Sequence, residues 1–523
     1  MTGCGRLIRL ILRRDRVIMP IWILVFGVLP AVYLASFETL FATDQERIDY
    51  ARLSAENAGF VALYGPLHGY SLGELVVWRG GFIPVMIGLA ALLTVIRHTR
   101  AYEEAGRTEL IGATVVGRFA PLAAALLATA GACLVAGVIV AVTMINAGQP
   151  AGGSIALGAV FTLSGWIFAG VGGVAAQVSG GARGARTLAV VVLGATYVLR
   201  LGGDISTLGD GRLEWLSWLS PIGWVHRIFP YGVNNFGPAL LAVASSLGLC
   251  VLSAYLLKKR DLGAGLLAQR LGPATAAAGL RSPVALAWRL HRGLLAGWTA
   301  GFAALGLIFG GVGSSVVQIA EDAGGVSDMF TRIGGAGAIS DAYFATTAAM
   351  CGLIAACYAV QAALRMRDEE QSGHAEALLS TAVSRYAWAG SHLLFALLGP
   401  ACALFAEGLL AGLVHRDLGP VLGASMAQLP AVWVLAGVTM LLIGVLPRLA
   451  AVAWGAIAVC LLVLLVGPLL SVDQWVLDLS PFTHVPHLPG SELSALPLVV
   501  LTVVAVALGG AGLLTLHRRD IPA

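Results

Sequence analysis

Two clusters of charged residues, each directly after a long apolar stretch, hold the side chains of this sequence best suited to polar chemistry. The clusters comprise Arg100, Glu103, Glu104, Arg107 and Glu109, and then Asp368, Glu369, Glu370, His374 and Glu376. Glu103 and Arg107 have the i,i+4 spacing of an ion pair on one helical face. This pattern predicts a short charged helix in each cluster. Such a helix suits docking into a groove of a soluble partner, although a solvated helix that binds nothing has the same pattern.

The residues needed for nucleotide hydrolysis are missing from the sequence. A P-loop has the pattern GxxxxGK[ST], in which the Lys reaches the phosphates, and protein kinases also need a phosphate-binding Lys. Only two lysines occur, and neither Lys258 nor Lys259 follows Gly or precedes Ser or Thr. The chain therefore cannot be an ATPase by itself, and we expect no catalytic and no cofactor-binding residues in it.

Other residues that could do chemistry are few. Glu407 lies inside an apolar stretch, where an ionisable group is costly and usually functional. It could contact a cation, carry a proton or bond to a neighbouring helix, or it could simply lie near the membrane surface. His484 and His487 resemble a pair of metal ligands, but no third ligand is evident and the seven Cys show no CxxC spacing. We therefore expect no metal site.

Apolar stretches dominate the chain. Of its 523 residues, 58% are hydrophobic and 11% are charged, whereas average soluble domains are about 25% charged. An apolar run of about 20 residues spans a bilayer as a helix, because lipid cannot satisfy open backbone groups. The predicted fold class is an all-α polytopic membrane protein. About twelve spans are predicted, at 17–37, 80–96, 119–145, 155–178, 187–201, 238–257, 294–317, 342–364, 387–414, 429–446, 449–470 and 496–516.

The distribution of arginines predicts the orientation of these spans. Short cytoplasmic loops carry an excess of Lys and Arg. The amino end and every second loop are basic, whereas the alternate loops are acidic or neutral and include Asp328, Asp341, Asp473 and Glu492. Both termini are therefore expected in the cytoplasm. The Ala- and Gly-rich segment 261–281, which contains Pro273, separates two predicted six-span halves, 1–260 and 282–523.

Sequence blocks that recur in order indicate that the second half duplicates the first. Trp215, Leu219, Ser220, Pro221 and Val225 recur 260 positions later as Trp475, Leu479, Ser480, Pro481 and Val485. Arg100, Glu103, Gly106, Glu109 and Arg118 recur 267 positions later as Arg367, Glu370, Gly373, Glu376 and Arg385. Arg13, Arg16 and Trp22 match Arg289, Arg292 and Trp298, and Arg260-Asp261 matches Arg519-Asp520. Two similar halves can enclose a path between them, which is typical of transporters.

The two Ser-Pro blocks predict a break in the chain before the last span of each half. Proline cannot continue a helix, and the residue before it avoids the α region. The predicted outer re-entrant segments, which would partly cap an exit, contain Trp215, Ser220, Pro221 and Trp224 in the first half and Trp475, Ser480 and Pro481 in the second. An ordinary loop anchored by aromatic side chains is the alternative.

Two further patterns concern placement and packing. Arg6, Arg9, Arg13 and Arg16 are spaced three, four and three, which puts them on one helical face, with apolar residues largely elsewhere. This pattern predicts a helix that lies flat at the lipid interface, although a basic flank without a further role would have the same composition. Gly306 and Gly310 form a GxxxG pattern, which lets two membrane helices approach closely.

Several short stretches of the sequence resemble those of a known family. The matching stretches are Ala58-Gly59-Phe60, Leu63-Tyr64-Gly65-Pro66, Arg97-His98-Thr99-Arg100, Glu103-Glu104-Ala105-Gly106-Arg107, Leu219-Ser220-Pro221-Ile222-Gly223-Trp224 and Arg260-Asp261-Leu262-Gly263-Ala264-Gly265. Over nearly its whole length the chain resembles the duplicated permeases of ABC-type exporters of polyketide antibiotics and drugs in actinobacteria. The resemblance implies six spans per half, an interfacial amino-terminal helix, a coupling helix between the second and third spans, and re-entrant helices before the sixth.

The resemblance also implies partners and a direction of transport. Two copies of a separately encoded ATP-binding cassette subunit would bind ATP and magnesium beneath a bacterial plasma membrane. The residues that would couple to them are Glu103, Glu104, Arg107, Glu109, Glu370, His374 and Glu376. Hydrophobic or amphipathic compounds would be exported along a path for which Tyr197, Glu407 and Trp454 are candidate lining residues. Membrane lipids are expected partners and nucleic acid is not.

Two departures and two other classes of protein stay open at this point. Thr483-His484 stand where Gly223-Trp224 stand in the first half, and the short loop at Pro447-Arg448 leaves little room for a second coupling element. The halves are therefore expected to couple unequally. An ion-coupled secondary transporter would usually need buried carboxylates along its path, and only Glu407 qualifies clearly. A membrane enzyme such as a lipid-linked glycosyltransferase would need carboxylates clustered in an outer loop. Glu38, Asp44 and Glu46 lie in such a loop but show no specific motif.

Overall fold

The computed structural model describes residues 2–55, 58–208, 211–261, 263–267, 274–275, 277–322, 335–466 and 474–520. These residues form helices joined by turns, and the described part of the chain contains no strand. Two compact units, Met1–Gly272 and Pro273–Ala523, divide the chain inside the segment expected as a linker. Asp328, Asp473 and Pro273, which entered the predictions of orientation and linker, lie outside the described residues. The predicted all-α polytopic fold class is confirmed.

Eleven helices within the described ranges are long and apolar enough to cross a membrane. They correspond to the first ten predicted spans and to the twelfth. The predicted eleventh span, 449–470, starts with a 3-10 turn, η3 (Pro447–Val452), and continues as α21 (Ala453–Val466). Its last residues lie outside the described ranges. The break before it follows from Pro447, which cannot donate the hydrogen bond that would extend the preceding helix.

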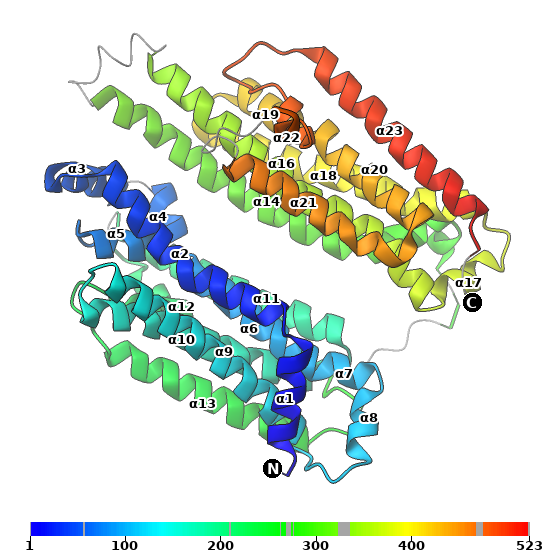
Figure 1. The fold of residues 1–523 in the computed structure, drawn as a ribbon, viewed down its shortest axis with the longest axis horizontal. Coiled ribbons are helices and arrows are strands. Elements are labelled where there is room, and N and C mark those ends of the chain that lie inside the picture. Colours follow the sequence, from blue (N-terminus) through cyan, green and yellow to red (C-terminus); the bar gives the residue numbers. More distant parts are fainter. Residues whose placement is uncertain are drawn as a thin grey trace. The chain divides into compact units, whose positions relative to one another are not determined.

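The first unit contains six of the long helices and several short ones. In chain order its helices are α1 (Cys4–Arg14), α2 (Ile18–Leu40), α3 (Asp44–Ala55), α4 (Ala58–Tyr64), α5 (Leu72–Arg79), α6 (Ile83–His98), α7 (Arg100–Glu104), α8 (Arg107–Gly112), α9 (Ala120–Asn146), α10 (Ala151–Val178), α11 (Ala182–Ser206), η1 (Glu214–Leu219), α12 (Pro221–His226) and α13 (Gly237–Lys258). Figure 1 labels most of them.

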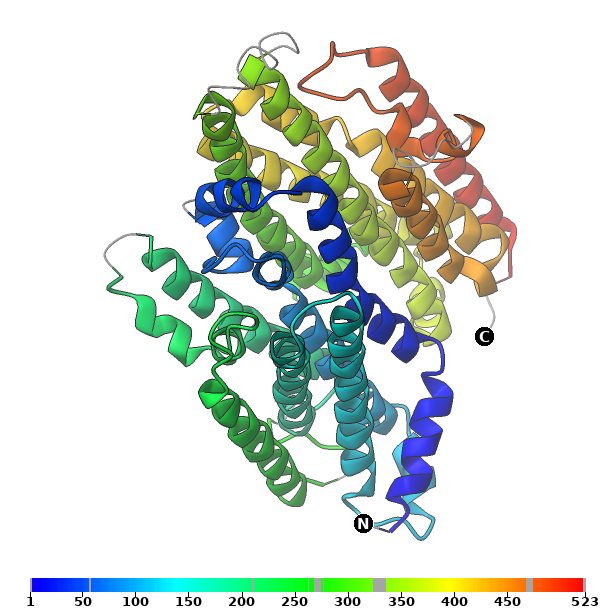
Figure 2. The ribbon, with the colours of Figure 1, turned by 60° about the vertical axis from the view of Figure 1, so that its left-hand side comes forward.

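Helix α10 forms the centre of the first unit. It packs against α6, α9, α11 and α13, and it runs alongside α9 and α13 in Figure 1 and Figure 2. Small residues bring α9 and α10 into backbone contact, since a Cβ at Gly137 would lie 2.4 Å from the carbonyl oxygen of Gly158. The close approach buries most of α10, which therefore fixes the positions of the helices around it.

The amino-terminal helix α1 is separate from the first long helix. Figure 1 shows α1 turning away from the axis of α2. Arg6, Arg9 and Arg13 are exposed, whereas Ile11 is buried, and α1 packs on α9. Arg16, predicted on the same helical face, lies past the end of α1 because the helix stops before Asp15. The turn between α1 and α2 is held by Asp15, whose buried carboxylate meets His98 Nε2 at 2.7 Å and also pairs with Arg97. This ion pair anchors the amphipathic helix to the end of α6.

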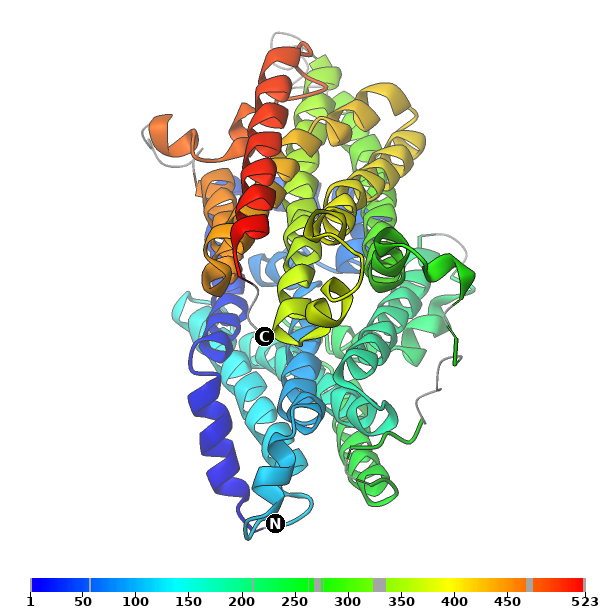
Figure 3. The ribbon, with the colours of Figure 1, turned by 90° about the vertical axis from the view of Figure 1, so that its right-hand side faces the viewer.

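The second unit has the same kinds of element. Its helices are η2 (Ala278–Leu280), α14 (Pro283–Asp322), α16 (Gly335–Gln371), α17 (His374–Leu379), α18 (Arg385–His415), α19 (Leu418–Met426), α20 (Leu429–Val445), η3, α21, α22 (Gln474–Leu477), η4 (Pro481–His484) and α23 (Ala495–Arg518). Helix α23 packs along α20, as Figure 3 shows with α23 in red. In this unit the amphipathic start and the first span form one continuous helix, α14, with no break like that at Asp15.

The GxxxG pattern has the packing role that glycines at this spacing predict. A Cβ at Gly306 would lie 2.3 Å from the carbonyl oxygen of Glu407, and one at Gly310 would lie 2.6 Å from that of Ala411. Helices α14 and α18 therefore touch along their backbones, and any larger side chain on either glycine would force them apart. The backbone of Glu407 is thus part of a tight helix contact.

Candidate functional site

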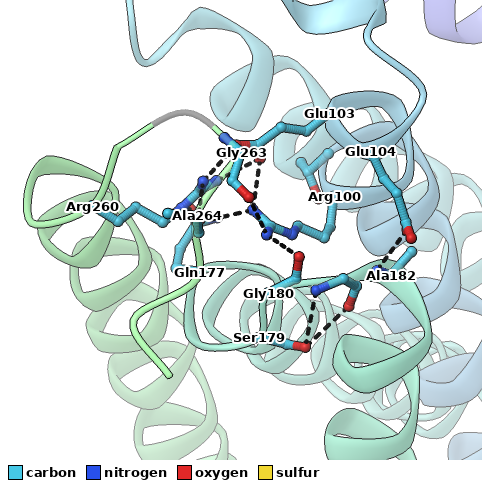
Figure 4. Close-up of polar contacts among 12 residues, drawn as sticks. Arg100, Glu103, Glu104, Gln177, Ser179, Gly180, Ala182, Arg260, Gly263 and Ala264 are labelled. Atoms are coloured by element: carbon cyan, nitrogen blue, oxygen red, sulfur yellow. Dashed lines mark hydrogen bonds and ion pairs between the residues drawn. The ribbon is translucent and has the colours of Figure 1, made fainter. Parts of the chain in front are cut away.

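The charged cluster after the second span folds around one buried carboxylate. Glu103, on α7, accepts hydrogen bonds from Arg260 Nη1 at 2.5 Å and Nη2 at 2.7 Å, and from the backbone N–H of Gly263 at 2.7 Å. Arg100 Nη1 lies 3.2 Å from the same carboxylate. Figure 4 shows these contacts. The side chains of Glu103 and Arg260 are 7% and 5% exposed, so the pair is shielded from water.

The two arginines of this cluster satisfy backbone carbonyls as well as the carboxylate. Arg100 donates to the carbonyl oxygens of Ala264 and Gly263, both at 3.1 Å, and to that of Gly180. Arg260 Nε donates to Gln177 Oε1 at 2.8 Å. Planar guanidinium groups suit such contacts because their N–H groups point in fixed directions. The segment after α13 is thereby tied to α7 and to the end of α10 (Figure 4).

Glu104 faces a different element. Its Oε2 accepts a hydrogen bond from the backbone N–H of Ala182 at 2.9 Å, at the first turn of α11. The first turn of a helix has free N–H groups and a partial positive charge, so a carboxylate there is favourable. Glu104 is nevertheless an exposed residue. The adjacent carboxylates of Glu103 and Glu104 thus bind α7 to the segment after α13 and to the start of α11.

The second unit repeats this arrangement with the equivalent residues. Glu370 is 1% exposed at its side chain and pairs with Arg519 Nη2 at 2.5 Å and with Arg367 Nη1 at 2.9 Å. A fourth residue also matches. Arg118 donates to the carbonyl oxygens of Leu257 and Arg260, and Arg385 donates to those of His517 and Arg519. We call these sets the first latch (Arg100, Glu103, Arg118 and Arg260) and the second latch (Arg367, Glu370, Arg385 and Arg519).

The recurring sequence blocks therefore meet in space within each unit. The blocks after spans two and eight supply the carboxylate and two arginines of each latch, and the Arg-Asp blocks that follow spans six and twelve supply the remaining arginine. Each latch joins the chain at or just after the end of the second long helix of its unit to the chain after the last long helix. Of the seven residues expected to contact a partner, Glu103 and Glu370 are buried in latches.

Four of the five remaining predicted coupling residues, all except Glu104 on α7, are exposed on two short helices next to the latches. Arg107 and Glu109 lie on α8, and His374 and Glu376 lie on α17. Each helix follows a glycine in the left-handed region, Gly106 at φ 69° and Gly373 at φ 74°. Glycine adopts this backbone conformation without steric cost. The chain thus turns sharply after each latch and presents a six-residue helix to solvent.

The surroundings of the two latches differ. In the second unit Glu369 Oε2 lies 3.3 Å from His392 Nε2, and His392 Nδ1 lies 3.0 Å from His291 Nε2. The first unit has Tyr102 at the position equivalent to Glu369, and there the anchoring contacts are those of Asp15 with Arg97 and His98. Both arrangements join the amino-terminal part of a unit to its latch, but they do so with different side chains.

The two Ser-Pro blocks occupy equivalent places. Ser220 Oγ donates to the carbonyl oxygen of Thr196 at 2.6 Å and accepts from the N–H of Gly223 at 3.3 Å, so it caps α12. Ser480 is buried and begins η4, with Pro481 buried at its first position. Among the aromatic residues, Trp224 donates to the Trp218 carbonyl at 2.6 Å, and Trp215 and Trp475 are 56% and 67% exposed. Short helices thus precede the last long helix of each unit.

The residues predicted to line a path are distributed over both units. Tyr197, on α11, is half-buried and donates from its hydroxyl to the carbonyl oxygen of Ala62 at 3.1 Å. Glu407 is 2% exposed, so it lies in the interior of its unit and not at an interface with water. Trp454, on α21, is 42% exposed. No group of three or more His, Cys, Asp or Glu that could hold a metal occurs among the residues that the structure describes.

Several contacts were not predicted from the sequence. Arg200 and Asp204 form a buried ion pair at 2.8 Å on α11, and Arg200 also donates to the Ala62 carbonyl at 2.8 Å. The signal for it was the i,i+4 spacing of Arg200, at the end of the predicted span 187–201, and Asp204, just past that end. Trp166 donates to the Ala130 carbonyl at 3.0 Å, and Trp433 donates to that of Leu397 at 3.1 Å. These pairs share the offset of 267 found for the latches.

Fold and site together define a duplicated, all-helical membrane protein with one latch in each half. Comparison with known proteins agrees with this class. The family described as "Multidrug efflux system permease Rv1217c, C-terminal domain" matches residues 280–517. The chain is also 42% identical over 529 aligned residues to the multidrug efflux system permease protein Rv1217c of Mycobacterium tuberculosis, covering 99% of this chain and 95% of that protein. The chain belongs to this family of multidrug efflux system permeases, which confirms the predicted resemblance.

Proposed function

We propose that this protein is the membrane-spanning permease of an ATP-driven efflux pump that exports hydrophobic or amphipathic compounds. Family membership supports efflux, and the lack of a P-loop lysine requires that a separate subunit bind ATP and magnesium. The observation that carries the proposal is the duplication of an exposed, charged short helix beside each latch. Two equivalent docking helices fit two copies of one ATP-binding cassette subunit.

The latches suggest how movement of these subunits would reach the membrane helices. Closure of the subunits around ATP would push α8 and α17. Because each latch ties the neighbouring segment to the end of the last long helix, the displacement would move several helices of a unit together. The two halves would then rock about a path between them, in alternating access. In this proposal the latch ends of both units, with both termini, face the cytoplasm of a bacterial cell.

Charge reversal of the exposed helices tests the docking. The permease is copurified with the ATP-binding subunit, and the double variant Glu109→Arg with Glu376→Arg is compared with the native pair. We expect at least a tenfold loss of association and loss of ATP-driven transport in vesicles. The double variant Glu38→Arg with Glu492→Arg makes the same change of charge at two exposed positions far along the chain from the latches, and it should leave association unchanged.

Two results would contradict the proposal at different levels. Unchanged association in the α8 and α17 double variant would show that the subunit docks elsewhere. Uphill transport by the purified permease alone, driven by an ion gradient in vesicles, would reject ATP coupling itself. It would favour an ion-coupled transporter, for which the buried carboxylate of Glu407 is the one candidate group noted above.

A further inference from the structure

The first unit contains a cavity that the efflux mechanism above does not use. Its volume is about 460 Å³, which is within the range of about 300–1,000 Å³ typical of drug-sized ligand sites. The walls come from α5, the start of α6, α10, α12 and the loop after α12, and they include Trp78, Phe161, Val225 and Phe229. The cavity lies near the start of α10, whereas the latch contact of Gln177 lies at the end of that helix, about 24 Å away at 1.5 Å per residue.

One wall of the cavity is a strained loop that its neighbours hold in place. Phe229, Tyr231 and Asn234 all have positive φ, at 49°, 64° and 50°, a backbone conformation that is strained for residues other than Gly. Tyr231 fits a slot between two glycines, since a Cβ at Gly73 or Gly153 would lie 2.5 or 2.2 Å from its ring. Strain of this kind persists where the surroundings fix the backbone, and it is common at ligand sites. The wall is therefore formed before any ligand binds.

The polar groups of the cavity give it a negative charge. Glu74 is the one acidic lining residue, and no lining residue is Lys or Arg. Its Oε2 accepts hydrogen bonds from the backbone N–H of Ser71 at 3.1 Å and from Ser71 Oγ at 2.7 Å, and Oε1 accepts none among the described residues. Burial lowers the pKa of His226 to about 3, with Arg200 adding to the effect, and burial lowers that of His68, so both imidazoles are neutral at pH 7.

We propose that this cavity binds a lipophilic organic cation. Its aromatic part would pack against Phe161, Val225 and Phe229, and its charge would lie near Glu74 Oε1 and over the faces of aromatic rings such as that of Trp78, where cations are attracted. Nothing in this proposal depends on ATP or on a partner subunit. The site therefore belongs to the isolated permease, and its test is independent of the efflux mechanism.

Two probes of the same shape and opposite charge test the site. Binding of tetraphenylphosphonium and of tetraphenylborate to the purified permease is measured by equilibrium dialysis in detergent. We expect saturable binding of the cation and at least tenfold weaker binding of the anion. Glu74→Gln should weaken cation binding about tenfold, which corresponds to about 1.4 kcal/mol, and it should still fold because Gln can replace Glu in a capping box.

The control and a second variant keep the test decisive. Glu46→Gln, on α3 and outside the cavity, removes a carboxylate with the same kind of capping contact, to Thr43 just before the helix. It should leave binding unchanged. Gly232→Leu places a side chain about 3.5 Å from Glu74 Oε1 in an exposed part of the wall, and it should block the cation without disturbing the core. Equal binding of both probes, or a less than twofold effect of both Glu74→Gln and Gly232→Leu, would overturn the proposal.

Discussion

Glu103 and Glu370 each lie between an arginine three residues earlier and an arginine from a distant part of the same half. Such buried ion pairs add little net stability, because removing charges from water costs about as much as the pair returns. Their value lies in specificity, since a guanidinium fork and a carboxylate fit in few geometries. Arg260 has both its Nη groups on Glu103. At the residue scale, the latches fix how two remote segments meet.

Neutralising a latch carboxylate should therefore be costly. Glu103→Gln leaves two buried guanidinium groups without their counter-charge, and breaking such pairs costs about 3–5 kcal/mol. We expect a clear fall in the melting temperature of the purified permease, and a similar fall for Glu370→Gln. Glu109→Gln, on the exposed face of α8, is the control and should change stability by no more than about 0.5 kcal/mol. Equal melting temperatures for all three variants would show that the latches contribute nothing to stability.

The elements that the latches hold are short, and their direction depends on single backbone positions. α8 and α17 each have six residues, too few to be stable in isolation. Their orientation is set by Gly106 and Gly373, which turn the chain in the left-handed region. A Cβ added to either glycine would have no heavy atom within 4 Å. The requirement for glycine at these positions is thus one of backbone conformation and not of space.

A substitution at either turn should act through that conformation. Gly106→Ala and Gly373→Ala should each destabilise the protein by about 1–2 kcal/mol, measured by thermal unfolding. Gly106→Asn should cost less than Gly106→Ala, because Asn tolerates the left-handed region better. Gly131→Ala, on α9, also meets open space but has helical backbone, so it should be neutral or slightly stabilising. A harmless Gly106→Ala would contradict the role given to the turn.

At the scale of the whole molecule, the two units have equivalent residues in their latches but differ in the residues around them. The first unit separates its amphipathic helix from the first span at Asp15, whereas the second unit runs both into α14. Glu369 connects the second latch to His392 and Trp388. The first unit has Tyr102 at the equivalent position, so it has no carboxylate there. The contacts beside the two docking helices therefore differ in kind, because Arg100 and Glu104 bind backbone groups in the first unit, whereas Glu369 binds side chains in the second.

This difference predicts unequal coupling of the halves. Glu109→Arg and Glu376→Arg are made separately in the complex with the ATP-binding subunit, and substrate-stimulated ATP hydrolysis is measured for each. We expect losses of different size, because α8 adjoins the contacts of Arg100 and Glu104 with backbone groups at the start of α11, whereas α17 adjoins the side-chain contact of Glu369 with α18. Equal losses, with association unchanged in both, would show that the two helices transmit force equally.

Much of this architecture could be predicted from the sequence, and the limits of the prediction have physical causes. Long apolar runs specify spans by themselves, so eleven of the predicted twelve correspond to long described helices. Spacing also predicted which blocks repeat, but it could not pair Arg260 with Glu103, because 157 residues separate them. The polar segment 44–79 has little amphipathic pattern, yet it contains α3 to α5. Local caps such as that of Ser71 on Glu74 start α5 where no periodic signal exists.

Arg519 stands one residue past the final helix, and two partners depend on it. Its guanidinium reaches Glu370, and its carbonyl oxygen accepts from Arg385 at 2.6 Å. An early stop codon or a protease cut just before this position would therefore remove a working part of the transporter. An affinity tag is better joined through a flexible spacer beyond residue 520, so that the tag does not break the contacts of Arg519 in the second latch.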